Sequence, residues 1–131
     1  MALNDLSLVN LDVSNVLRVS GDMIQADRGT VVQATSITTA VTLNRRAGTI
    51  TTVSAATVAG AEDSFTVTNS MVGANDVVIA CLAATSSAGL PVVVVDRIAA
   101  GSFRLTITNL DAATALNNTL AINFVVIKAG A

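Results

Sequence analysis

The feature that most constrains the fold of this chain is a succession of short segments rich in Val, Ile and Thr, each bounded by turn residues. Side chains branched at Cβ fit an extended strand better than a helix. No segment has clear helical periodicity, and Asp111–Leu116 is expected to form a turn or loop. Such spacing is typical of an antiparallel β-sandwich or barrel. We predict eight strands, at Val31–Thr35, Ala40–Leu43, Thr49–Val53, Ser64–Thr68, Asp76–Leu82, Pro91–Arg97, Phe103–Thr108 and Thr119–Lys128.

Alternation within these strands predicts the core, because successive side chains point to opposite faces of a sheet. Three of the strands have one large apolar face and one face that is Thr-rich or mixed, so we expect these strands to be half-buried. The expected core residues are Phe65, Val67, Phe103, Leu105, Ile107, Leu120, Ile122, Phe124 and Val126.

Two further segments, Val77–Ala84 and Val92–Val95, are apolar on both faces. In an antiparallel sandwich this pattern means that the second face is covered as well. The cover is either another layer of the same chain or a neighbouring subunit, and the lack of helices favours the subunit. We therefore take Val78, Val93 and Val95 as expected subunit contacts.

Two stretches of the sequence echo each other: GAEDSFTVTN at residues 60–69 and GSFRLTITN at residues 101–109. Each places one of the three Phe residues before apolar residues that alternate with Thr, and each ends in Asn. The echo is explained either by internal pseudo-symmetry, such as two interleaved Greek keys, or by chance convergence on the same alternation. One such pair does not make a repeat architecture, which needs several copies.

Residues 1–29 differ from the rest, because they carry alternating hydrophobic residues without clear hairpin turns. We interpret them as an extended arm that precedes a β-sandwich domain at residues 30–131 and adds a strand to an exposed sheet edge of another chain. The alternatives are a disordered terminus, which would hold fewer Leu and Val, or an extra edge strand. The expected contacts of the arm are Leu6, Leu8, Leu11, Val13 and Val16.

The composition favours a component of an assembly. Charged residues make up 12% of the 131 residues, compared with about 25% in an ordinary domain, and hydrophobic residues make up 52%. This length fits one domain, and we expect other chains to cover part of its thinly charged surface. A net charge of −2 and the scarcity of aromatic residues argue against nucleic acid and against an anionic membrane surface as partners.

The sequence contains no signal for insertion into a membrane or for export. Its longest apolar run, VVIACLAA at residues 77–84, is much shorter than the roughly 20 residues of a spanning helix. The first residues lack the basic region of a signal peptide, so synthesis in a cytoplasm without export is expected.

Catalytic chemistry is scarce in this sequence. The absence of His excludes Ser-His and Cys-His pairs, and the single cysteine, Cys81, excludes an internal disulfide and is expected to be buried. Glu62, Asp63 and Asp76 are better explained as solvated turn residues than as calcium ligands. We expect no enzymatic activity, cofactor, metal or small-molecule substrate.

One pair of basic residues remains to be explained. Arg45 and Arg46 lie in the turn LNRRAG, where they form either a solvated hairpin tip or a contact with an acidic partner surface. Both are among the residues expected to contact another subunit or a partner protein.

The sequence from about Gln33 to the C-terminus resembles a group of small virion structural proteins of tailed bacteriophages, including cyanophages. The phrases that carry the resemblance are VTLN with AGTIT, AGAE with SFTVTNS, AAGSFRLTITNL, and INFVVIKA. The resembling stretch covers about three quarters of the chain, whereas the arm departs from the shared part. The resemblance implies a jelly-roll-like sandwich, often trimeric, that sits on a protein shell.

Residues and resemblance together predict a capsid cement or decoration protein. The expected partners are two further copies in a homotrimer and the major capsid protein, on the outer capsid surface of a virion assembled in the host cytoplasm. Such a protein stabilises the phage head by bridging neighbouring capsid subunits. The alternative is a tail or head fibre module that binds a host surface glycan, although exposed aromatic residues or a polar sugar cleft are not evident in the sequence.

Overall fold

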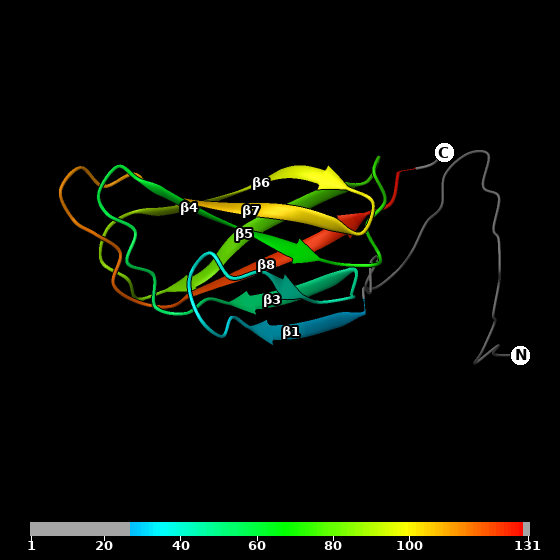
Figure 1. Ribbon diagram of the computed structural model, residues 1–131, viewed down its shortest axis with the longest axis horizontal. Coiled ribbons are helices and arrows are strands. Elements are labelled where there is room, and N and C mark those ends of the chain that lie inside the picture. Colours follow the sequence, from blue (N-terminus) through cyan, green and yellow to red (C-terminus); the bar gives the residue numbers. More distant parts are fainter. Residues whose placement is uncertain (1–26, 130–131) are drawn as a thin grey trace, which may run out of the picture.

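The computed structural model describes residues 27–129, which form a β-sandwich of two four-stranded sheets without a helix (Figure 1). This confirms the predicted all-β sandwich, and all eight expected strands are present with ends that shift by a few residues. Sheet A has the order β1-β3-β8-β5 and sheet B has the order β2-β4-β7-β6. The strands are β1 (Arg28–Val32), β2 (Val41–Thr42), β3 (Ala47–Thr51), β4 (Glu62–Thr68), β5 (Val77–Thr85), β6 (Pro91–Ala99), β7 (Ser102–Asn109) and β8 (Leu120–Ile127).

Both sheets are mixed, because the first four strands alternate between the two sheets. β1 pairs with β3 in parallel and β2 pairs with β4 in parallel, whereas the remaining pairs are antiparallel. A parallel pair needs a crossover connection, and here each crossover contains a strand of the opposite sheet. Purely antiparallel pairing is therefore wrong for these two pairs, and the jelly-roll arrangement stays a prediction.

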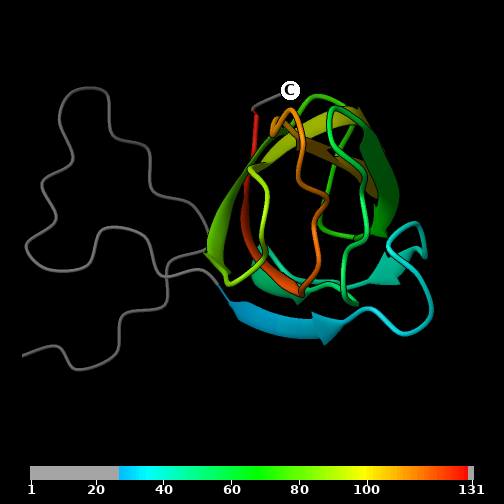
Figure 2. The ribbon, with the colours of Figure 1, turned by 90° about the vertical axis from the view of Figure 1, so that its left-hand side faces the viewer.

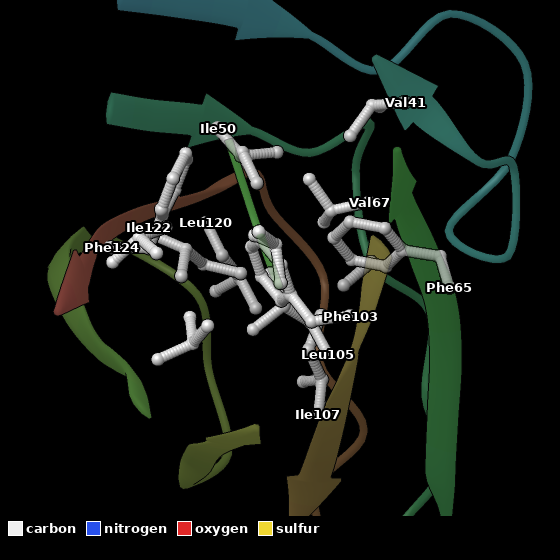
Figure 3. Close-up of a cluster of buried hydrophobic side chains, with 14 of the residues drawn as sticks. Val41, Ile50, Phe65, Val67, Phe103, Leu105, Ile107, Leu120, Ile122 and Phe124 are labelled. Carbon is white, nitrogen blue, oxygen red and sulfur yellow. The ribbon is translucent and has the colours of Figure 1, made fainter. Parts of the chain in front are cut away.

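The core lies between the two sheets and is built mainly by the central strands β7 and β8 with their neighbours (Figure 3). Phe103 of β7 packs against Phe124 of β8, with ring centroids 5.3 Å apart and a tilt of 56° between the rings. All nine side chains expected in the core are buried, so this prediction is confirmed. Each side chain of this size contributes roughly 1.5–3 kcal/mol when it leaves water.

The two similar sequence stretches form β4 and β7, which lie side by side and antiparallel in sheet B. Each ends in a buried asparagine, Asn69 after β4 and Asn109 at the end of β7. The N–H of Asn69 donates to the carbonyl of Gly101 at 2.8 Å, and the N–H of Asn109 donates to the carbonyl of Ala61 at 2.9 Å. The end of each stretch is therefore hydrogen-bonded to the start of the other, which gives the pair a local two-fold pseudo-symmetry.

Candidate interaction surface

The edge strands β5 and β6 contact each other along one side of the sandwich, as the end view in Figure 2 shows. The two segments that are apolar on both faces, Val77–Ala84 and Val92–Val95, lie within these strands. However, Val78 is buried in the core, and Val93 and Val95 are half-buried against it. The three side chains predicted as subunit contacts on these strands therefore face inward, and their neighbours face outward.

The inward or outward orientation of these side chains is set by strand pairing. Val78 pairs with Val126 of β8, and Val95 pairs with Leu105 of β7, and both partners belong to the core. Because side chains alternate with a period of two, one core pair determines the orientation of a whole strand. The sequence of a strand that is apolar on both faces does not by itself indicate which face is buried.

The outward side of β6 and the residues beside its start form an apolar surface that we call the β6 stripe. It consists of Val92 and Val94 of β6, Leu90 just before β6 and Leu110 just after β7. These side chains are between 37% and 59% exposed. Leu110 lies beside Leu90, because its N–H donates to the Leu90 carbonyl at 2.9 Å. Isolated exposed hydrophobic residues are common, whereas these four are adjacent and form one contiguous apolar surface at the edge of sheet B.

An ion pair ends the β6 stripe. Asp96 follows Val94 on the same side of β6 and accepts hydrogen bonds from Arg104, one of them from Nε at 2.7 Å. This hydrogen bonding lowers the pKa of Asp96 and raises that of Arg104. Beyond it, Arg97 adopts a left-handed φ of 51° at a β-bulge, which interrupts the edge. The apolar part of this edge is therefore limited to the stripe.

The outer face of sheet A carries a second apolar surface, the sheet A patch, which consists of Val77, Ile79, Cys81, Val125 and Ile127. Val77 pairs with Ile127 and Ile79 pairs with Val125 across β5 and β8. Cys81 is exposed on the same face, so the prediction that this cysteine is buried is wrong. The physical reason is again strand pairing, since Val78, Ala80 and Leu82 take the inward positions of β5.

Beside the patch, a polar network spans three strands of sheet A. Arg28 of β1 donates to Asn123 Oδ1 of β8 at 2.8 Å, and Thr49 of β3 donates to the same oxygen at 2.7 Å. A shallow pocket of ≈ 240 Å³ lies between this network and the patch, where Arg28, Asn123, Ile79 and Cys81 are among the lining residues. The outer face of sheet A therefore carries an apolar patch with the positively charged Arg28 beside it.

The remaining predicted contact residues lie elsewhere. Arg45 and Arg46 are exposed between β2 and β3, but these strands belong to different sheets, so the turn is not the predicted hairpin tip and instead connects the two sheets. Arg45 forms an ion pair with Asp27, and the Arg46 carbonyl accepts the N–H of Val126 at 2.7 Å. Contact of these arginines with an acidic partner stays a prediction. The arm residues Leu6, Leu8, Leu11, Val13 and Val16 lie outside the described residues.

Asp76 is not a solvated turn residue, since its side chain is only 3% exposed. It forms an ion pair with Lys128 and accepts the N–H groups of Gly73 at 2.6 Å and Ala129 at 3.1 Å. The hydrogen bond from Lys128, followed by that from Gly73, lowers the pKa of Asp76, although burial acts in the opposite direction. Asp76 therefore joins the end of β8 to the loop before β5.

The other two acidic residues that were expected in turns, Glu62 and Asp63, belong to β4. Glu62 is exposed at the start of the strand, and Asp63 accepts a hydrogen bond from Thr57 Oγ1 at 2.7 Å. Within residues 27–129, no group of three or more His, Cys, Asp or Glu side chains is arranged to hold a metal ion.

Comparison of the chain with protein-family models, with curated proteins and with solved structures finds no match. Over residues 27–129, no helix is long and apolar enough to cross a membrane.

Proposed function

We propose that the protein is a structural virion protein of the capsid cement or decoration type, which stabilises a phage head by bridging neighbouring major capsid subunits. The observation that carries the proposal is the β6 stripe, in which two exposed apolar side chains of the edge strand β6 continue into two exposed leucines beside its start. The low charge of the chain and its resemblance to small phage structural proteins support the same reading.

The β6 stripe would stabilise the shell because contact with a capsid protein buries its apolar surface. Its side chains are about half exposed, so covering them adds roughly 1 kcal/mol each before the cost of association is subtracted. One such contact is weak, but a shell repeats it many times, and every copy must detach before the shell opens. We propose that a homotrimer on the outer capsid surface presents three stripes to the surrounding major capsid proteins.

A fibre module that binds a host glycan has less support. Protein sites for sugars commonly stack a ring on an exposed aromatic side chain, and the three Phe residues of this chain, Phe65, Phe103 and Phe124, are all buried. The hydroxyl-lined pocket at Thr51, Thr85 and Thr119 therefore has no aromatic platform.

The proposal is tested with virions that carry the wild-type chain, a Val94→Lys variant or no chain. Val94→Lys places a charge in the middle of the stripe, and Val32→Lys places the same charge on an exposed position of β1 as a matched control. We expect Val94→Lys to be missing from virions and these virions to release DNA at a lower temperature, whereas Val32→Lys behaves as wild type.

Two results would contradict the proposal. One is equal resistance to heat and internal DNA pressure with and without the chain. The other is electron microscopy that locates the chain on the tail or on a fibre, which would favour the glycan-binding alternative.

A further inference from the structure

The sheet A patch is a second apolar surface that the bridging role does not use. Val77, Ile79 and Ile127 are between 46% and 51% exposed, and Cys81 lies among them. This patch lies on the outer face of sheet A, whereas the β6 stripe lies on the outer side of sheet B. The bridging role does not account for this patch, but the point at which the chain enters β1 does.

The chain enters sheet A in the same cross-strand row as the patch. Arg28 at the start of β1 pairs with Ala47, Ala47 pairs with Val125, and Val125 pairs with Ile79. Three inter-strand spacings separate Arg28 from Ile79, which is roughly 14 Å. The start of the described chain and the centre of the patch therefore lie on one line across the sheet.

Two interactions hold the chain at this point of entry. The Arg28 guanidinium lies over the outer face of sheet A, where it contacts Asn123 and Thr49. Asp27, one residue earlier, forms an ion pair with Arg45. The pocket lined by Arg28, Ala47 and Ile79 lies between the entry point and the patch, so a shallow depression leads from one to the other.

The preceding part of the chain has the length and the side chains to cover the patch. Residues 1–26 span up to roughly 85 Å when extended, several times the distance that is needed. In the stretch LDVS at residues 11–14, an extended backbone places Leu11 and Val13 on one face and Asp12 and Ser14 on the other. One apolar face with one polar face is what an apolar patch at the surface requires.

We propose that the N-terminal segment, residues 1–26 of the same chain, covers the sheet A patch with Leu11 and Val13 against β5 and β8. The attachment at Asp27 keeps this segment at a high effective concentration, on the order of millimolar, next to its own patch. A segment of a second copy has no such advantage in dilute solution. The segment therefore forms an outer layer on sheet A of its own molecule.

Cys81 is a built-in reporter for this cover, because it is the only thiol of the chain and lies within the patch. The rate of its alkylation by iodoacetamide is measured on the full chain at low concentration. A Leu11→Asp and Val13→Asp double variant places two charges on the apolar face. An Asn10→Asp and Ser14→Asp double variant adds the same charge elsewhere in the stretch and is the matched control.

We expect Cys81 to react about tenfold faster in the Leu11/Val13 variant than in the wild type, which corresponds to a covered state populated about ten to one. The Asn10/Ser14 variant should react as slowly as the wild type. Equal rates in all three proteins would overturn the proposal, and so would protection that disappears on dilution, because that result assigns the cover to a second copy.

A disulfide trap gives an independent test. In a Val13→Cys variant, mild oxidation should join residue 13 to Cys81 within one chain, which removes two hydrogen atoms from the mass and leaves a monomer on a non-reducing gel. Val32→Cys is the control, because it lies on β1, three strand spacings from β5 and beyond the Cα separation of about 7 Å that a disulfide tolerates. A disulfide-linked dimer of the Val13→Cys variant would contradict cover by the same chain. Both tests use the purified chain, so they are independent of the proposed role in a virion.

Discussion

Asn69 and Asn109 terminate two paired strands at opposite ends of sheet B, and both side chains are completely buried. The amide of Asn109 is fully engaged: Nδ2 donates to the carbonyls of Thr57 at 3.1 Å and Thr114 at 2.8 Å, and Oδ1 accepts the N–H of Leu90 at 3.1 Å. Asn69 likewise donates to the Arg45 carbonyl, at 2.7 Å, and accepts the N–H of Met71. The two similar sequence stretches therefore both end in a buried Asn whose side chain is hydrogen-bonded to the backbone of neighbouring loops.

Replacement of Asn109 by Ala should therefore destabilise the sandwich. It removes the side-chain partner of the Leu90 N–H and of the Thr114 carbonyl and one of two partners of the Thr57 carbonyl, at an expected cost of about 2–4 kcal/mol in the free energy of unfolding. Urea denaturation checks this value. Asn44→Ala is the control, because Asn44 is exposed and accepts one hydrogen bond, from the N–H of Ser70. A loss for Asn109→Ala no larger than for the control would contradict this account of the loops.

Truncation of Phe103 should be among the most costly changes in the core. Phe103 is buried at the centre of the sandwich and packs against Phe124, so Phe103→Ala creates a cavity and should cost about 3–5 kcal/mol. Val32→Ala removes carbon atoms at an exposed position of β1 and should change stability by less than about 0.5 kcal/mol. Thermal or urea unfolding of both variants is the measurement. Similar losses of stability in the two variants would contradict the assignment of Phe103 to the centre of the core.

Asp76 should make stability depend on pH in the acid range. The hydrogen bond from Lys128 and that from Gly73 hold its pKa below the ordinary value of 3.8. A carboxyl with a lowered folded-state pKa contributes stability that is present above the unfolded pKa and is lost as pH falls through the folded pKa. The stability difference between wild type and Asp76→Asn should therefore be complete at pH 7 and shrink below about pH 4.

Urea unfolding at a series of pH values from 7 down to 3 measures this difference. Lys128→Met removes the cation of the pair and should weaken the acid dependence, whereas Lys128→Arg keeps the positive charge and should retain most of it. The interpretation fails when Asp76→Asn and wild type lose stability in parallel over the whole range.

Gly89 and Gly101 test how much local space matters at a left-handed backbone position. Both have a positive φ, 76° and 82°, which costs a residue with a side chain roughly 1–2 kcal/mol. A Cβ at Gly101 meets nothing within 4 Å, but a Cβ at Gly89 comes within 2.9 Å of Asn109 Oδ1. Gly89→Ala should therefore lose clearly more stability than Gly101→Ala in urea unfolding, and equal losses would show that φ alone decides.

The orientation of β6 could have been read from the sequence. Asp96 is a charged residue that faces outward, and alternation then turns Val94 and Val92 outward as well. The same reasoning would also have turned Val95 and Val93 inward, as the structure has them. The signal was a single charged side chain at the end of an otherwise apolar segment.

The orientation of β5 could not have been found in this way. The acidic residue next to it, Asp76, is buried and faces inward together with Val78, because Lys128 and two backbone N–H groups satisfy its carboxylate. Treating Asp76 as an outward marker would have kept Cys81 on the wrong face. The orientation of β5 depends on the ion pair between Asp76 and Lys128, and these residues are far apart in the sequence.

By itself the sequence determined where the strands lie and which side chains of β4, β7 and β8 form the core, because alternation is a property of consecutive residues. Only the tertiary structure decided the two parallel strand pairs, the burial of Asp76 and the exposure of Cys81. These depend on which distant strand supplies the hydrogen-bond partners, and that pairing selects one face of an apolar strand for the core and leaves the other to water or to a partner.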